Sequence, residues 1–202
     1  MSPVEAPQTP RAVEEAEAPL RGVTADQLLR DFIDQRCELI QGEVILMSPA
    51  SSQHGMVAFD FGVLLGQYVK QNQLGRCFAA ETGFLVQRDP DTVLAPACSV
   101  VLAARIKELG VPTHFFPEAP AVAVEVVSPS DSAEAVDDNA RRWLAAGTRL
   151  VWVLYPTGRR VTVDRSLEEA RLLAVGDTLD GADVLPGFAV KVSELFAGLD
   201  DA

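Results

Sequence analysis

The chain has 202 residues, of which 48% are hydrophobic and 23% charged, and its formal net charge is −12. This length and balance predict one soluble globular domain that is long enough to bury a substantial core. The sequence has no run of about 18 apolar residues, so no membrane span is expected. A chain this acidic is repelled by nucleic-acid phosphates unless its basic residues are locally concentrated.

The N-terminal segment differs in composition from the rest of the chain. Residues 1–21 are rich in proline, alanine and glutamate, which predicts a flexible acidic arm ahead of a single domain over 22–202. The arm has no apolar core and does not resemble a secretory signal. The three cysteines, Cys37, Cys77 and Cys98, form no CxxC pair, which argues against a disulfide framework and a thiolate zinc site. We therefore expect a cytoplasmic protein.

The domain is expected to begin with a helix, a hairpin and a longer helix. Thr24 is placed to cap a short helix that runs to about Asp34. Strands over 37–40 and 43–46 flank a Gln-Gly turn, as in a β-hairpin. Apolar residues at helical spacing then predict a helix over 52–71. Its expected buried stripe comprises Val57, Phe61, Leu64, Leu65 and Tyr68.

The middle of the chain is rich in predicted strands. We expect one strand over 76–87 and a short one over 93–94, on either side of a turn at 89–91. The runs 97–103 and 121–128 are continuously apolar, a pattern typical of strands buried on both faces.

The last third is expected to complete an α/β fold. A helix over 132–146 and a buried strand over 149–155 follow the apolar strand 121–128, which predicts a right-handed βαβ crossover. Short strands over 160–165 and 169–175 and a closing helix near 192–196 complete the pattern. The fold class is therefore α/β, with a mixed central β-sheet flanked by helices.

Glu125 points most strongly to chemistry, because it interrupts the otherwise apolar run 121–127. Burying an unpaired carboxylate costs several kcal/mol, so this side chain needs a cation, hydrogen bonds or an added proton. A metal site and a structural ion pair with an arginine both meet that need. The sequence leaves these two alternatives open.

Other polar residues are candidates for the same site. Asn139 lies at the margin of the core-facing side of its helix, from which it can face the strand of Glu125. An ordinary boundary amide is the alternative. His54, in the first turn of its helix, fits a packing role as well as a functional one. The remaining carboxylates on predicted strands are Glu38, Glu43 and Glu81, each of which is expected to be solvated if it acts alone.

Several common chemistries are excluded. The chain contains no GxSxG, GxGxxG, GxxxxGK[ST] or HExxH motif. His54 and His114 are too few for a multi-histidine metal site. Ser128 lies near Glu125 but precedes a proline, and no residue near it in the sequence resembles a base for it.

Basic residues concentrate in the segment 141–165, where Asp164 is the only acidic residue. The segment contains Arg141, Arg142, Arg149, Arg159, Arg160 and Arg165. An ordinary solvated face and a surface that binds DNA phosphates are both consistent with this pattern.

Short segments along the chain occur in an order typical of one family. They are Cys37-Glu38-Leu39-Ile40-Gln41-Gly42-Glu43, Met47-Ser48-Pro49, His54-Gly55, Glu81-Thr82-Gly83, Leu94-Ala95-Pro96, Val124-Glu125-Val126-Val127-Ser128-Pro129-Ser130, Trp143-Leu144-Ala145-Ala146-Gly147 and Val184-Leu185-Pro186-Gly187-Phe188. As an ordered set over about 23–196 they resemble the Uma2 family of bacterial restriction endonucleases, a branch of the PD-(D/E)xK nuclease superfamily.

The resemblance implies a restriction-endonuclease-like fold and metal-dependent cleavage of DNA. In such nucleases an aspartate and a glutamate on neighbouring strands hold one or two Mg²⁺ ions, for which Mn²⁺ can substitute. A lysine, which this family carries on the following helix, assists the cleavage reaction. By resemblance, Glu125 matches the strand glutamate and Glu81 an auxiliary carboxylate. A homodimer would suit such a nuclease, because two-fold symmetry matches two antiparallel DNA strands, but the sequence leaves the oligomeric state open.

The chain departs from the family pattern at the residues that matter most for catalysis. The position of the metal-binding aspartate is Ala97, and the position of the lysine is Asn139. Losing a metal carboxylate and a transition-state cation slows hydrolysis by several orders of magnitude. Two functions remain open: a weakened or inactive Mg²⁺-dependent DNA endonuclease, and a non-catalytic, nuclease-like binding or assembly protein.

Overall fold

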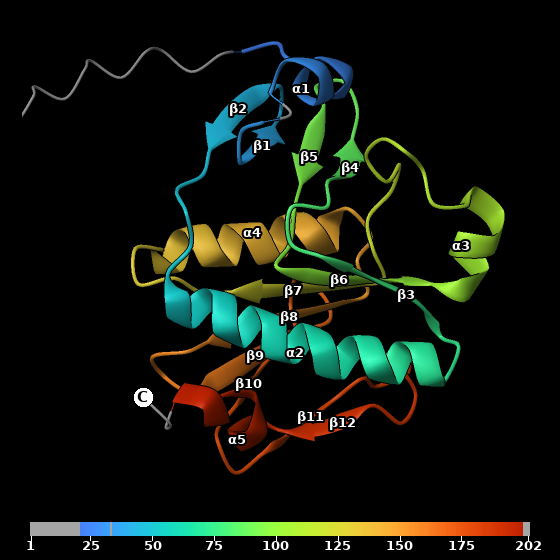
Figure 1. The fold of residues 1–202 in the computed structure, drawn as a ribbon. Coiled ribbons are helices and arrows are strands. Elements are labelled where there is room, and N and C mark those ends of the chain that lie inside the picture. The colour runs from blue at the N-terminus through green and yellow to red at the C-terminus, as the bar shows by residue number, and fades with distance from the viewer. Residues whose placement is uncertain (1–20, 33, 200–202) are drawn as a thin grey trace, which may run out of the picture.

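The central element is a mixed six-stranded sheet with the strand order β10-β9-β8-β7-β6-β3 (Figure 1). Its strands are β3 (Gly75–Ala79), β6 (Cys98–Leu102), β7 (Val122–Val126), β8 (Leu150–Tyr155), β9 (Arg160–Asp164) and β10 (Ala170–Leu173). This computed structural model describes residues 21–32 and 34–199, so the predicted arm over 1–21 lies outside the described residues except for Arg21. Within the sheet only β7 and β8 run parallel, and α4 (Ala133–Ala145) joins them. The predicted strand–helix–strand unit is therefore confirmed.

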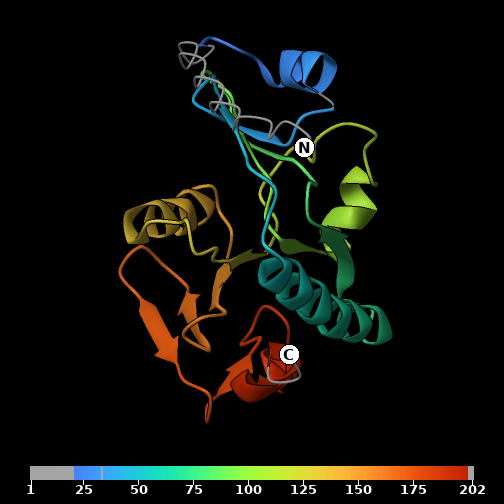
Figure 2. The ribbon, with the colours of Figure 1, turned by 60° about the vertical axis from the view of Figure 1, so that its left-hand side comes forward.

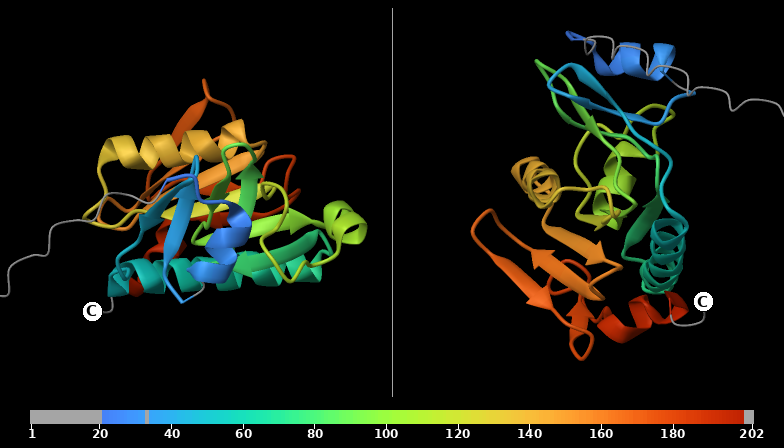
Figure 3. Two further views of the ribbon diagram at one scale, coloured as in Figure 1. Left: turned by 90° about the horizontal axis from the view of Figure 1, so that it is seen from above. Right: turned by 90° about the vertical axis from the view of Figure 1, so that its left-hand side faces the viewer.

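Helices cover both faces of this sheet. α2 (Ser52–Gln71) lies on one face and α4 on the other (Figures 2 and 3). Side chains alternate along β7, so Val122, Val124 and Val126 join the core under α2. Ala123 joins the core under α4. Since residues two apart share a face of a strand, Glu125 also faces α4.

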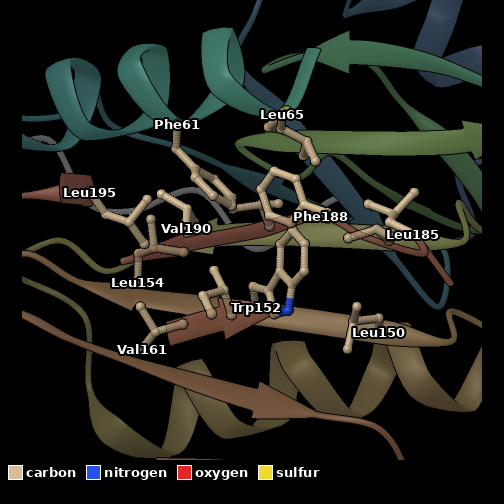
Figure 4. Packing of buried hydrophobic residues seen from close by; sticks show 14 of the residues in the cluster. Phe61, Leu65, Leu150, Trp152, Leu154, Val161, Leu185, Phe188, Val190 and Leu195 are labelled. Carbon is tan, nitrogen blue, oxygen red and sulfur yellow. The ribbon is translucent and has the colours of Figure 1, made fainter. Parts of the chain in front are cut away.

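The core under α2 is aromatic at its centre (Figure 4). Trp152 on β8 stacks on Phe188 with 5.4 Å between the ring centroids, and Phe61 of α2 meets Trp152 edge-on at 5.5 Å. The C-terminal elements that close this side are β11 (Thr178–Asp180), β12 (Ala189–Lys191), α5 (Val192–Leu195) and the 3₁₀ helix η1 (Ala197–Leu199). The predicted stripe of α2 needs two corrections, because Leu64 is 38% exposed and Tyr68 is only half-buried, while Val69 is buried. The buried spacing is therefore 57, 61, 65 and 69.

A second, four-stranded sheet has the order β2-β1-β5-β4 and lies above α4 in Figure 1. Its strands are β1 (Cys37–Ile40), β2 (Glu43–Leu46), β4 (Phe84–Gln87) and β5 (Thr92–Leu94). The predicted hairpin is confirmed by the antiparallel pairing of β1 with β2. α1 (Ala25–Asp31) begins at the predicted cap, where Thr24 and Gln27 form a capping box.

The expected single strand over 76–87 is wrong, because the chain changes sheets within it. β3 belongs to the central sheet and β4 to the small sheet. In the link between them Glu81 has a left-handed φ of 67°. The backbone of Gly83 lies so close to the Phe115 ring that a Cβ would come within 2.4 Å of it. A further helix that the sequence did not predict, α3 (Ala103–Leu109), follows β6 directly.

No helix within 21–32 or 34–199 is long and apolar enough to cross a membrane.

Candidate functional site

A cavity of about 460 Å³ lies between the small sheet, the end of β7 and α4. Its lining brings together every site residue expected from the sequence: His54, Glu81, Ala97, Glu125 and Asn139. These residues come from five separate segments of the chain, so the fold rather than sequence proximity gathers them.

The strand register explains why Ala97 and Glu125 are neighbours. β6 and β7 are antiparallel, and Cys98 pairs with Val124. Ala97 directly precedes Cys98 and Glu125 directly follows Val124, so both lie next to this pair, and both line the cavity. A carboxylate at position 97 would therefore share this cavity with that of Glu125, but Ala97 contributes only a methyl group, which also packs against the core under α2.

α4 holds one oxygen of the partly buried Glu125 carboxyl. Trp143 Nε1 donates to Glu125 Oε1 at 2.7 Å, and Asn139 Nδ2 donates to the same oxygen at 3.0 Å. The two donors are four residues apart on the helix and so share one face. Among the described residues no arginine pairs with Glu125, which removes the structural ion pair that the sequence had left open.

The surroundings disfavour a bare charge on Glu125. Burial, together with the smaller effect of the negative charge of Glu38, raises the pKa of Glu125 to about 8 against the hydrogen bonds from Trp143 and Asn139, which lower it. At neutral pH the side chain is therefore mostly neutralised, either by a proton or by a cation in its place.

Glu38 also lines the cavity, and the expectation that it is solvated is wrong. Alternation along β1 puts Leu39 in the small core and Glu38 on the opposite face, which the cavity covers. Its Oε1 accepts a hydrogen bond from the Ala95 amide at 2.9 Å. Burial raises the pKa of Glu38, although the Ala95 amide and the charges of Arg142 and Arg36 lower it.

His54 meets Ser128 at the cavity wall, with 3.2 Å between Nδ1 and Oγ. The sequence places no base next to Ser128 along the chain, but the fold brings His54 to it. The first turn of α2 reaches Ser128 across 74 positions of sequence, a contact that local spacing cannot reveal. Burial and the charge of Arg36 lower the pKa of His54, so its imidazole is neutral near pH 7.

Glu81 lies at the rim of the cavity. It forms an ion pair with Arg36, with 2.7 Å between Nε and Oε1, and its side chain is 56% exposed. Arg36 is further fixed by donating from Nη1 to the carbonyl oxygen of Ser48 at 2.7 Å. An exposed pair of this kind contributes little stability, but it commits much of the Glu81 charge to a protein cation.

Most arginines of the segment 141–165 are paired with carboxylates. Arg141 pairs with Asp137, while Arg149 and Arg165 both contact Asp183. Arg142 lies 3.8 Å from Asp138, and Arg160 lies over the Tyr155 ring at 5.0 Å. Of the six arginines only Arg142 lines the cavity. The geometry thus puts one arginine of the segment at the site rather than a continuous basic surface.

The fit to a metal ion depends on the free oxygens of the cavity. Within 21–32 and 34–199, no group of three or more histidine, cysteine, aspartate or glutamate side chains is placed to hold a metal ion. Mg²⁺, however, is usually bound by one or two carboxylates together with water and substrate phosphates. Both donors from α4 act on Oε1 of Glu125, which leaves Oε2 for a cation. The residues therefore fit an open, loosely held Mg²⁺ site anchored by Glu125.

The comparisons with known proteins agree with this architecture. The crystal structure of "a putative nuclease belonging to DUF820" from Anabaena variabilis is similar to this chain, with a TM-score of 0.75 and 23% sequence identity. The alignment covers 88% of this chain and 99% of that one. At this identity the likeness shows the fold, which is a nuclease-like α/β fold. The fold class predicted from the sequence is confirmed.

The sequence comparison gives the family. The family model Uma2, described as "Putative restriction endonuclease", matches residues 25–193. The chain belongs to the Uma2 family, and the resemblance found in the sequence is confirmed. No curated protein matches the chain.

The hydrogen bond from Trp143 gives a first prediction. Trp143→Phe keeps a buried ring but removes the donor to Glu125, so we expect a loss of about 1–3 kcal/mol in the free energy of unfolding. The loss should be larger at pH 9, where Glu125 is charged, than at pH 5, where it is protonated. Urea unfolding at the two pH values measures it. Trp152→Phe is the matched control, because Nε1 of this buried tryptophan has no hydrogen-bond partner in the part of the chain that the structure describes. Equal pH dependence in the two variants would contradict the assigned role of the Trp143 N–H.

Proposed function

We propose that this protein is a Mg²⁺-dependent DNA phosphodiesterase of the nuclease fold whose cleavage is strongly slowed by Ala97 and Asn139. The observation that supports it best is the position of Glu125, in the lining of the cavity that position 97 also lines. A glutamate and an aspartate at these two positions would form the adjacent carboxylate pair of a metal-dependent nuclease. Here one half of that pair is present.

Each polar residue of the cavity has a distinct role in the proposed reaction. A bound Mg²⁺ would stabilise charge on the phosphate and favour ionisation of the attacking water. Glu125 would hold the ion through the oxygen that α4 leaves free, and Trp143 and Asn139 fix the orientation of the carboxylate. His54 is neutral and can take up a proton during turnover. Arg142 supplies positive charge to the cavity wall for a phosphate.

Two side chains account for the slow rate. Ala97 removes a carboxylate from the metal site, and Asn139 stands where the family carries a lysine. The Asn139 amide donates to Glu125 and brings no positive charge to the phosphate. Loss of a single electrostatic donor to a transition state costs about 10²–10³-fold in rate.

The wider surface adds little attraction for DNA. The net charge is −12, and several arginines of the segment 141–165 are paired with aspartates. We therefore propose that DNA binding is weak and sensitive to salt. A homodimer, which would bring two cavities to the two strands of a duplex, is part of the same proposal.

A plasmid-nicking assay tests the proposed function. We expect slow nicking of supercoiled DNA with Mn²⁺ or Mg²⁺ that is lost with EDTA and in Glu125→Ala, because this substitution removes the anchor of the ion. Glu43→Ala, which changes a hairpin carboxylate outside the cavity lining, is the control and should nick like the natural chain. Nicking that survives in Glu125→Ala, or its complete absence with both ions, would reject the proposal.

The second candidate is a nuclease-like protein that binds or assembles without cleaving. The same two residues, Ala97 and Asn139, favour it, because each removes a group that cleavage uses. This candidate predicts that no nicking occurs with either ion while the purified protein still binds DNA or another macromolecule in the presence of EDTA.

A further inference from the structure

Ser128 is a nucleophilic side chain that the proposed cleavage of DNA does not use. It lies in the loop between β7 and α4, and its Oγ is 3.2 Å from Nδ1 of His54. Within the described residues this hydroxyl has no other hydrogen-bond partner. When the imidazole carries its proton on Nε2, the Ser128 hydroxyl donates to Nδ1. A serine hydroxyl that donates to a neutral histidine at this distance has the arrangement of an activated nucleophile.

Backbone hydrogen bonds hold both members of this pair in place. The Ser128 N–H donates to Oδ2 of Asp131 at 2.8 Å, in the turn that precedes α4. The His54 N–H donates to Oγ of Ser51, the N-cap residue of α2, at 3.3 Å. Each side chain therefore extends from a backbone segment whose conformation a local hydrogen bond fixes.

The surroundings of His54 suit a base that takes up a proton and then releases it. Burial and the charge of Arg36 lower the pKa of His54, while the charge of Asp131 and the carbonyl of Val126 raise it. Because the lowering effects are larger, the imidazole is neutral before the reaction, as a general base must be. Asp131 and the Val126 carbonyl stabilise the imidazolium that forms when the Ser128 proton is transferred.

The cavity that contains this pair favours an uncharged substrate when no metal ion is bound. Carboxyl groups outnumber guanidinium groups in its lining, where Glu38, Glu81, Glu125 and Asp131 accompany Arg36 and Arg142. A carboxylate-rich lining repels an anionic phosphodiester but not a neutral ester. Apolar contacts for such an ester come from Ile40, Ile45, Leu46, Met47, Val127 and Val136.

We infer that Ser128 is the nucleophile, and His54 the general base, of a metal-independent hydrolysis of small, uncharged carboxylic esters. Ser128 Oγ forms a bond to the carbonyl carbon while its proton passes to His54, and the alcohol leaves with that proton. Water then attacks the acyl-serine and gives a proton to His54, the carboxylic acid leaves, and His54 returns the proton to Ser128. Arg142, in the same lining, brings positive charge for the oxygen that becomes negative in each step.

Labelling with a fluorophosphonate probe in EDTA tests the inference, because this probe forms a covalent bond with activated serines. Mass spectrometry of the natural chain is expected to find the label on Ser128. Ser128→Ala should abolish the label, and His54→Gln should slow labelling at least about 100-fold, since the base is absent. Ser130→Ala is the matched control and should be labelled like the natural chain, because Ser130 lines the same cavity without a contact to a histidine among the described residues.

Hydrolysis of p-nitrophenyl acetate in EDTA should show the same order of rates among these variants. A natural chain that takes no label, or takes it on a residue other than Ser128, would overturn the inference, and so would equal labelling rates in His54→Gln. Ester hydrolysis that EDTA abolishes would require a metal ion and would also overturn it. The proposed function is tested separately, because nicking needs Mn²⁺ or Mg²⁺ and is expected to be absent under the conditions of the labelling.

Discussion

Replacing Ala97 with aspartate and Asn139 with lysine is expected to raise Mn²⁺-dependent nicking of supercoiled DNA by at least about 100-fold over the natural chain. The aspartate would project from the lining of the cavity that Glu125 also lines and would add a second metal carboxylate. The lysine would lie on the face of α4 that already reaches Glu125 and would bring positive charge to the cavity. Initial rates of nicking at matched protein concentration measure the gain.

The controls for this double variant are further substitutions of residues in the same cavity. The double variant with Glu125→Gln added should be as slow as the natural chain, because the anchor of the ion is then absent. Each single variant should give a smaller gain than the pair, since carboxylate and lysine act on the same transition state. A double variant that folds but nicks no faster than the natural chain would show that the chain does not retain the remainder of a nuclease site.

Glu125→Gln is expected to stabilise the metal-free protein at pH 8 by a few kcal/mol and to have little effect at pH 5. The pKa of Glu125 is about 8 in the folded protein, against 4.5 for an ordinary glutamate. The folded state therefore keeps a proton that the unfolded state releases. Stability falls as pH rises from about 4.5 to about 8, by at most about 1.4 kcal/mol per pH unit. Glutamine cannot ionise, so this loss disappears.

Urea unfolding in EDTA at several pH values measures this effect as the difference between the natural chain and the variant. Taking the difference removes the titration of other groups, such as Asp164, whose pKa burial also raises. Glu43→Gln serves as the control and should show no such pH-dependent difference. A loss of several kcal/mol in Glu125→Gln at pH 8 would mean instead that a charged Glu125 stabilises the fold.

Much of the fold could be predicted, because its longest elements have strong local patterns. The helix over 52–71 follows from apolar residues three and four apart, and the hairpin follows from two short strands around Gln41-Gly42. The apolar runs on either side of α4 predicted the parallel pair β7 and β8. In each case the pattern that fixes the element lies within the element itself.

The errors occurred where tertiary contacts decide the structure. The chain between 76 and 87 is continuous in pattern but divides between two sheets, at a link where Phe115 covers Gly83. α3 has no buried residue, so it lacks the apolar stripe that would have predicted it. The exposure of Leu64 depends on how α2 is rotated against the sheet, which a stripe of neighbouring apolar residues leaves uncertain.

In the candidate site, too, some residues could be found from local sequence patterns and others only from tertiary contacts. Glu125 is conspicuous as a charge in an apolar strand, and Asn139 lies on the predicted face of the next helix, so both could be found from the sequence. The sequence does not indicate that the N–H of Trp143 donates to Glu125, because this contact depends on how α4 packs against β7. Glu38 and the contact between His54 and Ser128 depend on the position of the small sheet and α2, which no local pattern specifies.

Diffraction from crystals soaked in Mn²⁺, recorded where the anomalous signal of manganese is strong, is the most direct test of the central claim. The cavity between Glu125 and position 97 is expected to show a manganese peak in contact with the Glu125 carboxylate, with higher occupancy in Ala97→Asp at the same Mn²⁺ concentration. Crystals in which Glu125 contacts only Trp143 and Asn139, with no peak in the cavity of either protein, would contradict the claim that this is a nuclease metal site that has lost one ligand.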